Sequence, residues 1–167
     1  MNMLDSLLAI KRFRQGQAET AMRQQRQALE QARQERVAAE ELLTRLLADG
    51  VLAEQRLYAG LYTRLVHLGD IEDVRLAVAA LRQGEQRQQD ARDRAQRGQE
   101  EAQQYFDQAR ARHQEAARQT SKYIELSSSF SATRALASER REDLEMEEAA
   151  SVRRERENWG ASDGDNP

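Results

Sequence analysis

Residues 65–75 read LVHLGDIEDVR and interrupt a long run of Arg, Gln, Glu, Ala and Leu. Gly69 can take the left-handed conformation that commonly ends a helix, and Asp70 can cap the start of the next one. Asp73 follows Asp70 at the spacing of an approximate capping box. Leu68 and Ile71 would pack at the corner. The stretch therefore predicts that a helix reverses its direction near Gly69-Asp70.

Before this turn, apolar residues recur at alternating steps of four and three. That spacing keeps one stripe facing a partner helix, as in the a and d positions of a coiled coil. Polar side chains occupy the same register at Lys11, Gln15, Gln25 and Arg36. The apolar members of this seam are Leu4, Leu8, Ala18, Met22, Leu29, Ala32, Ala39, Leu43 and Leu46.

A second seam of the same period follows the turn. Between Gln83 and Glu101 it is nearly all polar or alanine, so it buries little apolar area and should be thin. Its apolar members are Val74, Val78, Leu81, Ala95, Ala102, Phe106, Ala109, Ala116, Tyr123, Phe130, Ala137 and Leu144.

The two seams predict an all-α fold, a long antiparallel two-helix coiled-coil hairpin. We expect helices over about 3–68 and 71–158, forming a single domain over 1–159, and a disordered tail over 160–167. The Met1 end should lie near residues 130–138, so that the second helix overhangs. Asp49-Gly50 is a further interruption, where one interior glycine favours a kink over a break, although the sequence alone does not decide between them.

Composition excludes several classes of protein. Apolar residues make up 39% of the 167-residue chain and charged residues 33%, while Cys is absent and the only Pro is the last residue. A charge of -3 without a basic patch argues against a nucleic-acid partner. No signal peptide or membrane-spanning stretch is recognisable, so we expect a soluble cytoplasmic protein without direct membrane insertion.

The window 51–81 is more apolar than a two-stranded seam can bury. Either it folds into a thicker local bundle, which we favour, or part of it is a docking surface. Tyr58 and Tyr62 are four residues apart and share a helix face. The large apolar residues of this window are Leu52, Leu57, Tyr58, Leu61, Tyr62, Leu65, Val66, Leu68, Ile71, Val74, Val78 and Leu81.

No catalytic, metal or cofactor site is indicated. The phosphate-binding, dinucleotide-binding, nucleophile-elbow and zinc-protease motifs are missing, and no ligand pattern surrounds His67 or His113. Helix capping accounts for the acids near His67, and we expect a protein that is not an enzyme. The acidic run 142–148 (EDLEMEE) and the basic stretch 10–14 (IKRFR) are expected as solvated faces rather than docking strips, and the role of the serine-rich 127–131 is open.

The chain resembles the YscO/FliJ family, the central stalk proteins of type III secretion and flagellar export ATPases. The resemblance covers the chain to about residue 150. It rests on the length, the hairpin pattern, the opening LLAIKRFR (7–14) and the middle segment LYAGLYTRLVHLGDIEDVRLAVAALR (57–82). The serine-rich and acidic stretches have no counterpart in the family pattern.

The resemblance implies that the paired terminal ends enter the pore of a hexameric ATPase. It also implies contact with the export-gate protein through the tip of the hairpin, and in some members with export chaperones. The candidate ATPase contacts are Leu4, Leu8, Lys11, Arg12, Phe13 and Arg14, with the segment Phe130–Leu144. The candidate gate or chaperone contacts are Tyr58, Tyr62, Arg64, His67, Glu72 and Arg75.

Other hypotheses fit the same pattern. A stalk protein should be a monomer alone, whereas a general coiled-coil scaffold or tether would form parallel dimers through the same seam. A flagellar export stalk is a second alternative. A secretion chaperone would need a wider apolar groove than two helices provide.

Overall fold

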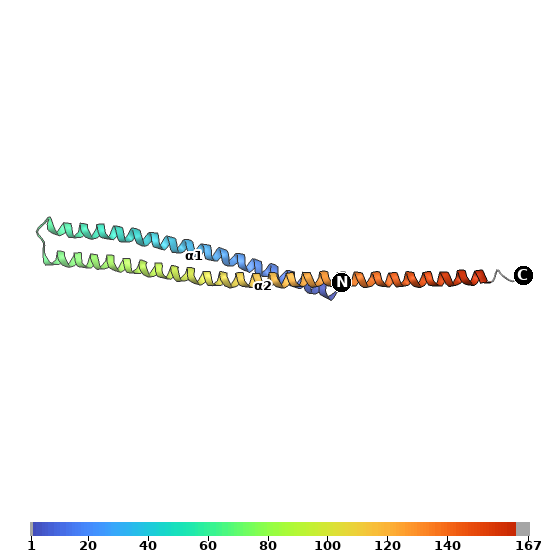
Figure 1. Cartoon of the computed structure of the whole chain (residues 1–167). Helices are drawn as coiled ribbons and strands as arrows, with labels where there is room; N and C mark the ends of the chain where they lie inside the picture. The colour runs from blue at the N-terminus through green and yellow to red at the C-terminus, as the bar shows by residue number, and fades with distance from the viewer. Residues whose placement is uncertain (1, 163–167) are drawn as a thin grey trace. The chain divides into compact units, whose positions relative to one another are not determined.

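The computed structural model describes residues 2–162 and contains two long helices, α1 (Met3–Tyr62) and α2 (Leu68–Ser162). They pack against each other as an antiparallel hairpin, joined by residues 63–67 (Figure 1). No strand occurs within the described range. The predicted all-α hairpin is therefore confirmed.

The contacts group the chain into two compact units. Unit 1 comprises Met1–Gln15 with Ala116–Pro167, and unit 2 comprises Gly16–Glu115 with the turn. Each unit contains a stretch of α1 paired with a stretch of α2. Our prediction of a single domain over 1–159 stays a prediction.

Capping residues start both helices. At α1, the N–H of Asn2 donates to Oδ2 of Asp5 at 3.3 Å, and the N–H of Asp5 donates back to the Asn2 carbonyl at 3.0 Å. At α2, the N–H of His67 donates to Oδ2 of Asp70 at 3.0 Å, and the N–H of Asp70 donates to the His67 carbonyl at 3.0 Å. Each acid therefore satisfies an amide that the first helical turn cannot.

The turn differs from the predicted one. The first helix ends at Tyr62 rather than near residue 68, and the second begins at Leu68 rather than near residue 71. Asp70 is the third residue of α2, not its N-cap, because its carboxylate reaches back to His67. Gly69 lies within the first turn of the helix, and no glycine has a positive φ in the described part of the chain.

The capping contact at Asp70 should contribute to stability. We expect Asp70→Ala to lower the free energy of unfolding by about 1 kcal/mol, because the His67 amide loses its acceptor. Urea unfolding followed by circular dichroism measures this change. Asp73→Ala is the matched control, since the Asp73 side chain makes no capping contact in the first turn. Equal losses in the two variants would contradict the assigned cap.

The seam of unit 2 follows the predicted register. Every predicted α1 position from Ala18 to Leu46 is half-buried or buried, and so is each predicted α2 position from Val74 to Ala109. Leu29 is the most buried apolar side chain, with 4% of its surface exposed. Heptad spacing alone therefore located the interface between the helices.

Polar contacts replace apolar ones in the middle of this seam. Arg36 donates to the side-chain carbonyl of Gln99 and forms an ion pair with Glu40 at 2.9 Å. Gln88 donates to the Ala39 carbonyl at 3.3 Å. These bonds satisfy side chains that a two-helix seam partly removes from water, and their geometry selects one pairing of the helices.

Gly50 is buried and lies inside the continuous α1 helix, so the interruption that we expected is not a break. A Cβ atom at this position would overlap the carboxylate of Glu85. Glu85 is itself held by Arg82, which pairs with Glu54 at 2.8 Å and with Glu85 at 3.4 Å. Gly50 thus leaves room for a carboxylate between the two helices.

In unit 1, the first turns of α1 pack against α2 through a buried hydroxyl. The Thr120 hydroxyl oxygen lies 3.0 Å from the Ala116 carbonyl and 3.3 Å from the Lys11 carbonyl, so its one proton can be donated to either of them. The ammonium group of Lys11 lies 5.2 Å from the ring centroid of Tyr123. Ser127 donates to the Asp5 carboxylate at 3.5 Å, which places the start of α1 beside that serine.

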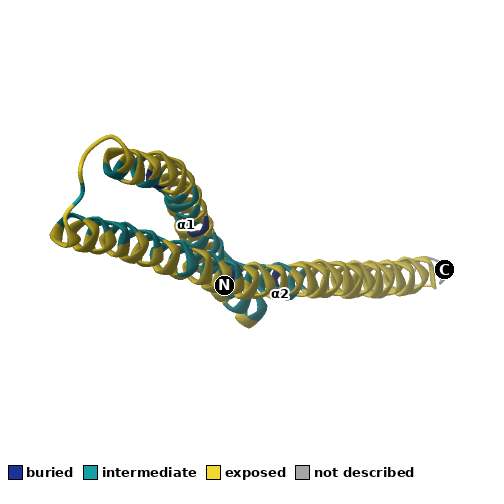
Figure 2. Cartoon of the chain, turned by 90° about the vertical axis from the view of Figure 1, so that its left-hand side faces the viewer, coloured by how far each residue is buried: buried dark blue, intermediate teal, exposed yellow. Residues whose placement is uncertain are grey.

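The seam of α2 ends sooner than predicted. Every residue from 128 to 162 is exposed, so the seam positions predicted at Phe130, Ala137 and Leu144 are wrong (Figure 2). The reason is that α1 begins at Met3 and offers nothing to pair with beyond this level. Residues 160–162 of the predicted tail are helical, and the rest of it lies outside the described residues.

Candidate interaction surfaces

The histidines have structural positions. His67 is exposed and precedes α2, where its backbone amide takes part in the cap, and His113 lies half-buried in the seam. Within residues 2–162, no group of three or more His, Cys, Asp or Glu side chains is placed to hold a metal ion. The arrangement therefore gives no reason to assign either histidine to a reaction.

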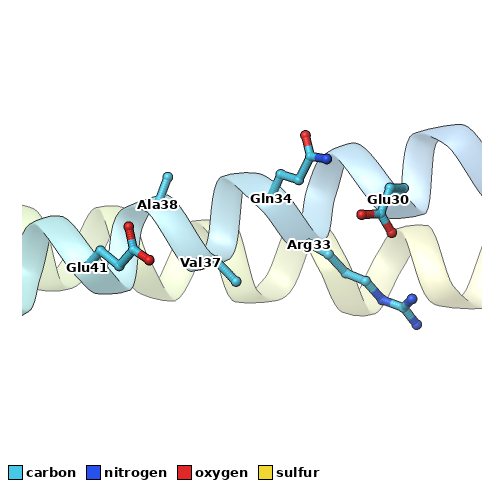
Figure 3. A pocket seen from close by; sticks show the side chains of 6 residues that line it. All are labelled: Glu30, Arg33, Gln34, Val37, Ala38 and Glu41. Carbon is cyan, nitrogen blue, oxygen red and sulfur yellow. The ribbon is translucent and has the colours of Figure 1, made fainter.

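Two surface hollows follow the outside of α1, and a third is lined from both helices by the polar residues Arg36, Glu40, Gln96, Gln99 and Glu100. Figure 3 shows the side chains of one α1 hollow spread along that helix. A hollow with walls from one helix cannot enclose a substrate or exclude water. Its lining residues are Glu30, Arg33, Gln34, Val37, Ala38 and Glu41.

Large apolar side chains remain exposed around the turn of unit 2. Tyr62, Leu65 and Leu68 expose 87%, 88% and 87% of their surfaces. The thicker local bundle that we favoured is therefore wrong, because two helices provide no third element to cover these side chains. Of the two interpretations of the window 51–81, the remaining one is that part of it is a docking surface. We call the exposed apolar residues Tyr58, Tyr62, Leu65, Leu68 and Ile71 the tip surface.

All six predicted gate or chaperone contacts lie on this part of unit 2 and are exposed. The guanidinium of Arg64 comes within 3.9 Å of the Asp70 carboxylate, and that of Arg75 within 3.9 Å of Glu72. These two pairs offset charge around the turn. Leu65 and Leu68 were not among the predicted contacts, because the predicted turn placed Leu68 at a packed corner.

The six predicted ATPase contacts divide into two sets. Leu4, Leu8 and Lys11 face α2 and are half-buried, so their first role is to hold unit 1 together. The other three are Arg12, Phe13 and Arg14, which are exposed.

Sequence reasoning missed two members of the outer face of α1 in unit 1. Met3 and Ile10 are exposed, and they share a helix face with Phe13. Their spacing of seven and three residues is the signal that could have found them. Exposed apolar and basic side chains thus combine on the first turns of α1.

The acidic run 142–148 lies on the exposed part of α2. Across the described chain, no ion pair joins its carboxylates to a basic side chain. Ser138 donates to Glu142 at 3.4 Å. The run fits the solvated face that we expected. Over residues 2–162, neither helix contains a stretch long and apolar enough to cross a membrane.

Comparison with known proteins gives two matches. The family described as type III secretion protein YscO matches residues 4–152. The 2.8 Å crystal structure of type III secretion protein YscO from Vibrio parahaemolyticus superposes with a TM-score of 0.80 and 23% identity, covering 87% of this chain and 92% of that one. No curated protein sequence matches. At 23% identity the superposition supports the fold alone. The family match covers most of the chain and therefore shows the family.

Proposed function

Because the chain belongs to the YscO family of type III secretion proteins, we propose that it is a non-enzymatic central stalk component of a type III secretion system. Its paired terminal ends would enter a hexameric export ATPase. The tip surface would contact the export-gate protein and, in some states, secretion chaperones. This role places the protein in the cytoplasm at the cytoplasmic face of the apparatus, as a monomer when alone and without a cofactor.

The exposed set Arg12, Phe13 and Arg14 carries the proposal for the ATPase end. These side chains project from a segment that the seam already holds through Lys11 and Thr120. An exposed aromatic ring beside two guanidinium groups is a combination enriched at protein interfaces. A held segment also loses little conformational entropy when it binds.

The tip surface supports the second contact. Its exposed apolar side chains have no covering element within unit 2, and such patches commonly mark protein interaction sites. The nearby charges at Arg64, Glu72 and Arg75 would surround the apolar contact as a polar rim.

The matching family is described by type III secretion, which favours that system over the flagellar alternative. The pairing of the two helices within the chain supports the stalk over the scaffold alternative, because a parallel dimer would need the same seam. The α1 hollow in Figure 3 has walls from one helix only, so it is not the wide apolar groove that a chaperone role would need. The stalk remains the function that best accounts for both exposed surfaces.

Charge reversal tests the ATPase contact. We expect Arg12→Glu/Arg14→Glu to weaken the stimulation of a purified hexameric export ATPase by tenfold or more in half-maximal concentration, because two attractive charges become repulsive. ATP hydrolysis and ring assembly are measured against increasing amounts of the protein. Folding should be unchanged, since both side chains are exposed.

The matched control is Arg87→Glu/Arg94→Glu, which makes the same charge change at exposed positions of unit 2. It should stimulate as the unmodified protein does. Full stimulation by the Arg12/Arg14 variant would refute the assigned ATPase contact. Absence of any effect of the unmodified protein at every ratio would refute the stalk role.

A further inference from the structure

Two features of unit 2 have no role in the observed hairpin. The Gly69-Asp70 step has the residues of a helix-reversing turn, yet the turn uses residues 63–67 and Gly69 is helical. Leu65 exposes 88% of its surface although it follows Leu57 and Leu61 at steps of four. Gly69 suits a turn but lies in a helix, and Leu65 suits the seam but is exposed. Together they indicate a second arrangement of the same residues.

We propose that unit 2 has two registers, related by sliding α1 along α2 by one heptad, and that the Gly50–Glu85 contact holds the observed one. In the second register, α1 gains the four residues 63–66 and α2 loses the three residues 68–70. The turn is then 67–70 (HLGD), with Gly69 inside it. Seven residues change in total, which is one heptad, so the seam positions of each helix still face the other helix.

The tip gains apolar pairing in the second register. Counting outward from the Gly50–Glu85 contact in steps of three and four puts Leu61 opposite Val74 in the observed register. After a slide of one heptad, Leu61 faces Leu81, and Leu65 leaves the surface to face Val78. The exposed leucine is thus a seam residue of the second register.

The caps can be exchanged in the same step. Asp70 now accepts from the His67 amide as the third residue of α2. With α2 starting at Ile71, Asp70 becomes the N-cap and Asp73 takes the place of the back-bonding acid. Asp70 therefore caps α2 in both registers, as the back-bonding acid in the observed one and as the N-cap in the second.

The leucines in the middle of the seam discriminate poorly between the registers. By the same counting, Leu46 faces Gln88 when the turn is at 63–67 and faces Ala95 after the slide. Leu43 likewise exchanges Arg92 for Gln99. Neither change removes a large apolar contact, so these two leucines do not oppose the slide. The hydrogen bonds from Arg36 to Gln99 and from Gln88 to the Ala39 carbonyl do oppose it, because the slide separates both pairs.

Glu85 also opposes the slide. In the observed register its carboxylate occupies the space left by Gly50, only 13% of its side chain is exposed, and Arg82 joins it to Glu54. After the slide it would lie against Leu57, which offers no hydrogen bond to a partly buried carboxylate. The glycine and the glutamate therefore select the register together.

The register decides whether the tip surface is available. Leu65 is part of that surface in the observed register and part of the seam in the other. That a partner reads this difference rests on the proposed function of the tip, whereas the slide itself does not.

The test measures the register directly, without a partner. The chain has no Cys, so Gln24→Cys and Gln89→Cys provide two spin-label sites on exposed faces of unit 2. A slide of one heptad lengthens the distance between the labels by about 10 Å, at ~1.5 Å per residue. The labelled protein should give one main distance by electron–electron double resonance.

Glu85→Leu in the labelled chain should produce a second population that is about 10 Å longer, because Leu57 then meets a leucine after the slide. Adding Gly69→Ala should remove that population, since alanine fits the helical position of the observed register, where a Cβ meets nothing, but not the glycine turn. A single unchanged distance in folded Glu85→Leu overturns the proposal. So does a second population that persists after Gly69→Ala.

Discussion

Leu29→Ala should lower the free energy of unfolding by about 2–4 kcal/mol, a large fraction of what a hairpin with so few buried side chains can have. Leu29 exposes 4% of its surface, and Ala109 is the other apolar side chain classed as buried in the described chain. Removing the leucine side chain leaves a cavity between two helices that no other element can fill. Urea unfolding followed by circular dichroism measures the loss.

Leu42→Ala is the matched control for that variant. It makes the same change in the same helix, at a side chain that is half exposed, so the loss should stay within about 0.5 kcal/mol. If both variants lose the same free energy, burial in the seam is not what stabilises unit 2.

Replacing the apolar side chains at the tip should affect binding rather than folding. We expect the triple variant Tyr62→Ser/Leu65→Ser/Leu68→Ser to bind the cytoplasmic part of the export-gate protein about a hundredfold more weakly. Burial of a large apolar side chain contributes about 1.5–3 kcal/mol, and partial burial of three such side chains would exceed the ~2.7 kcal/mol that a hundredfold represents. Calorimetric titration measures the affinity.

The control variant is Leu136→Ser/Leu144→Ser/Met146→Ser, which replaces three exposed apolar side chains of unit 1. This variant should bind the gate protein as the unmodified chain does. Both triple variants should unfold at nearly the unmodified urea concentration, because none of these side chains is buried. Equal loss of affinity in the two would show that general apolar character, not the tip, causes binding.

The helical seam could be predicted because its signal repeats. Each heptad adds independent support for the same stripe, and isolated polar members such as Lys11 or Arg36 do not change the period. In the structure, the Lys11 ammonium group lies over the Tyr123 ring, and Arg36 bonds to the Gln99 amide and the Glu40 carboxylate. The heptad positions of each helix could therefore be predicted without knowledge of the fold.

The turn could not be predicted to the residue, because its signal occurs once and is ambiguous. An aspartate near a helix start is an N-cap in one reading and a back-bonding acid three residues later in the other. Asp70 fits both positions, and the hydrogen bond from His67 shows which one the structure uses.

The misplaced end of the seam follows from the misplaced turn. In an antiparallel pair, each residue by which the turn moves shifts the facing residue by two. A turn near Gly69 would have brought the start of α1 level with residues 130–138, whereas the actual turn brings Asp5 to Ser127. Phe130, Ala137 and Leu144 keep the heptad spacing in both cases, and spacing does not reveal whether a partner helix is present.

Some residues of the candidate interaction surfaces were predicted from the sequence and others were missed. Phe13 and Tyr62 were proposed as contacts because of the resemblance to the YscO/FliJ family, and both are exposed in the structure. Leu65 was missed because its spacing resembles that of a seam residue, and only the observed turn leaves it exposed.

The exposed stretch from 128 to 162 changes what heating or denaturant would do to this chain. Helical hydrogen bonds there have no tertiary contact to protect them, so amide exchange in this stretch should reflect the intrinsic helix–coil equilibrium. The paired stretches open only when the seam separates. Loss of ellipticity is thus the sum of a gradual process over residues 128–162 and a cooperative one in the paired stretches, and the two have different enthalpies.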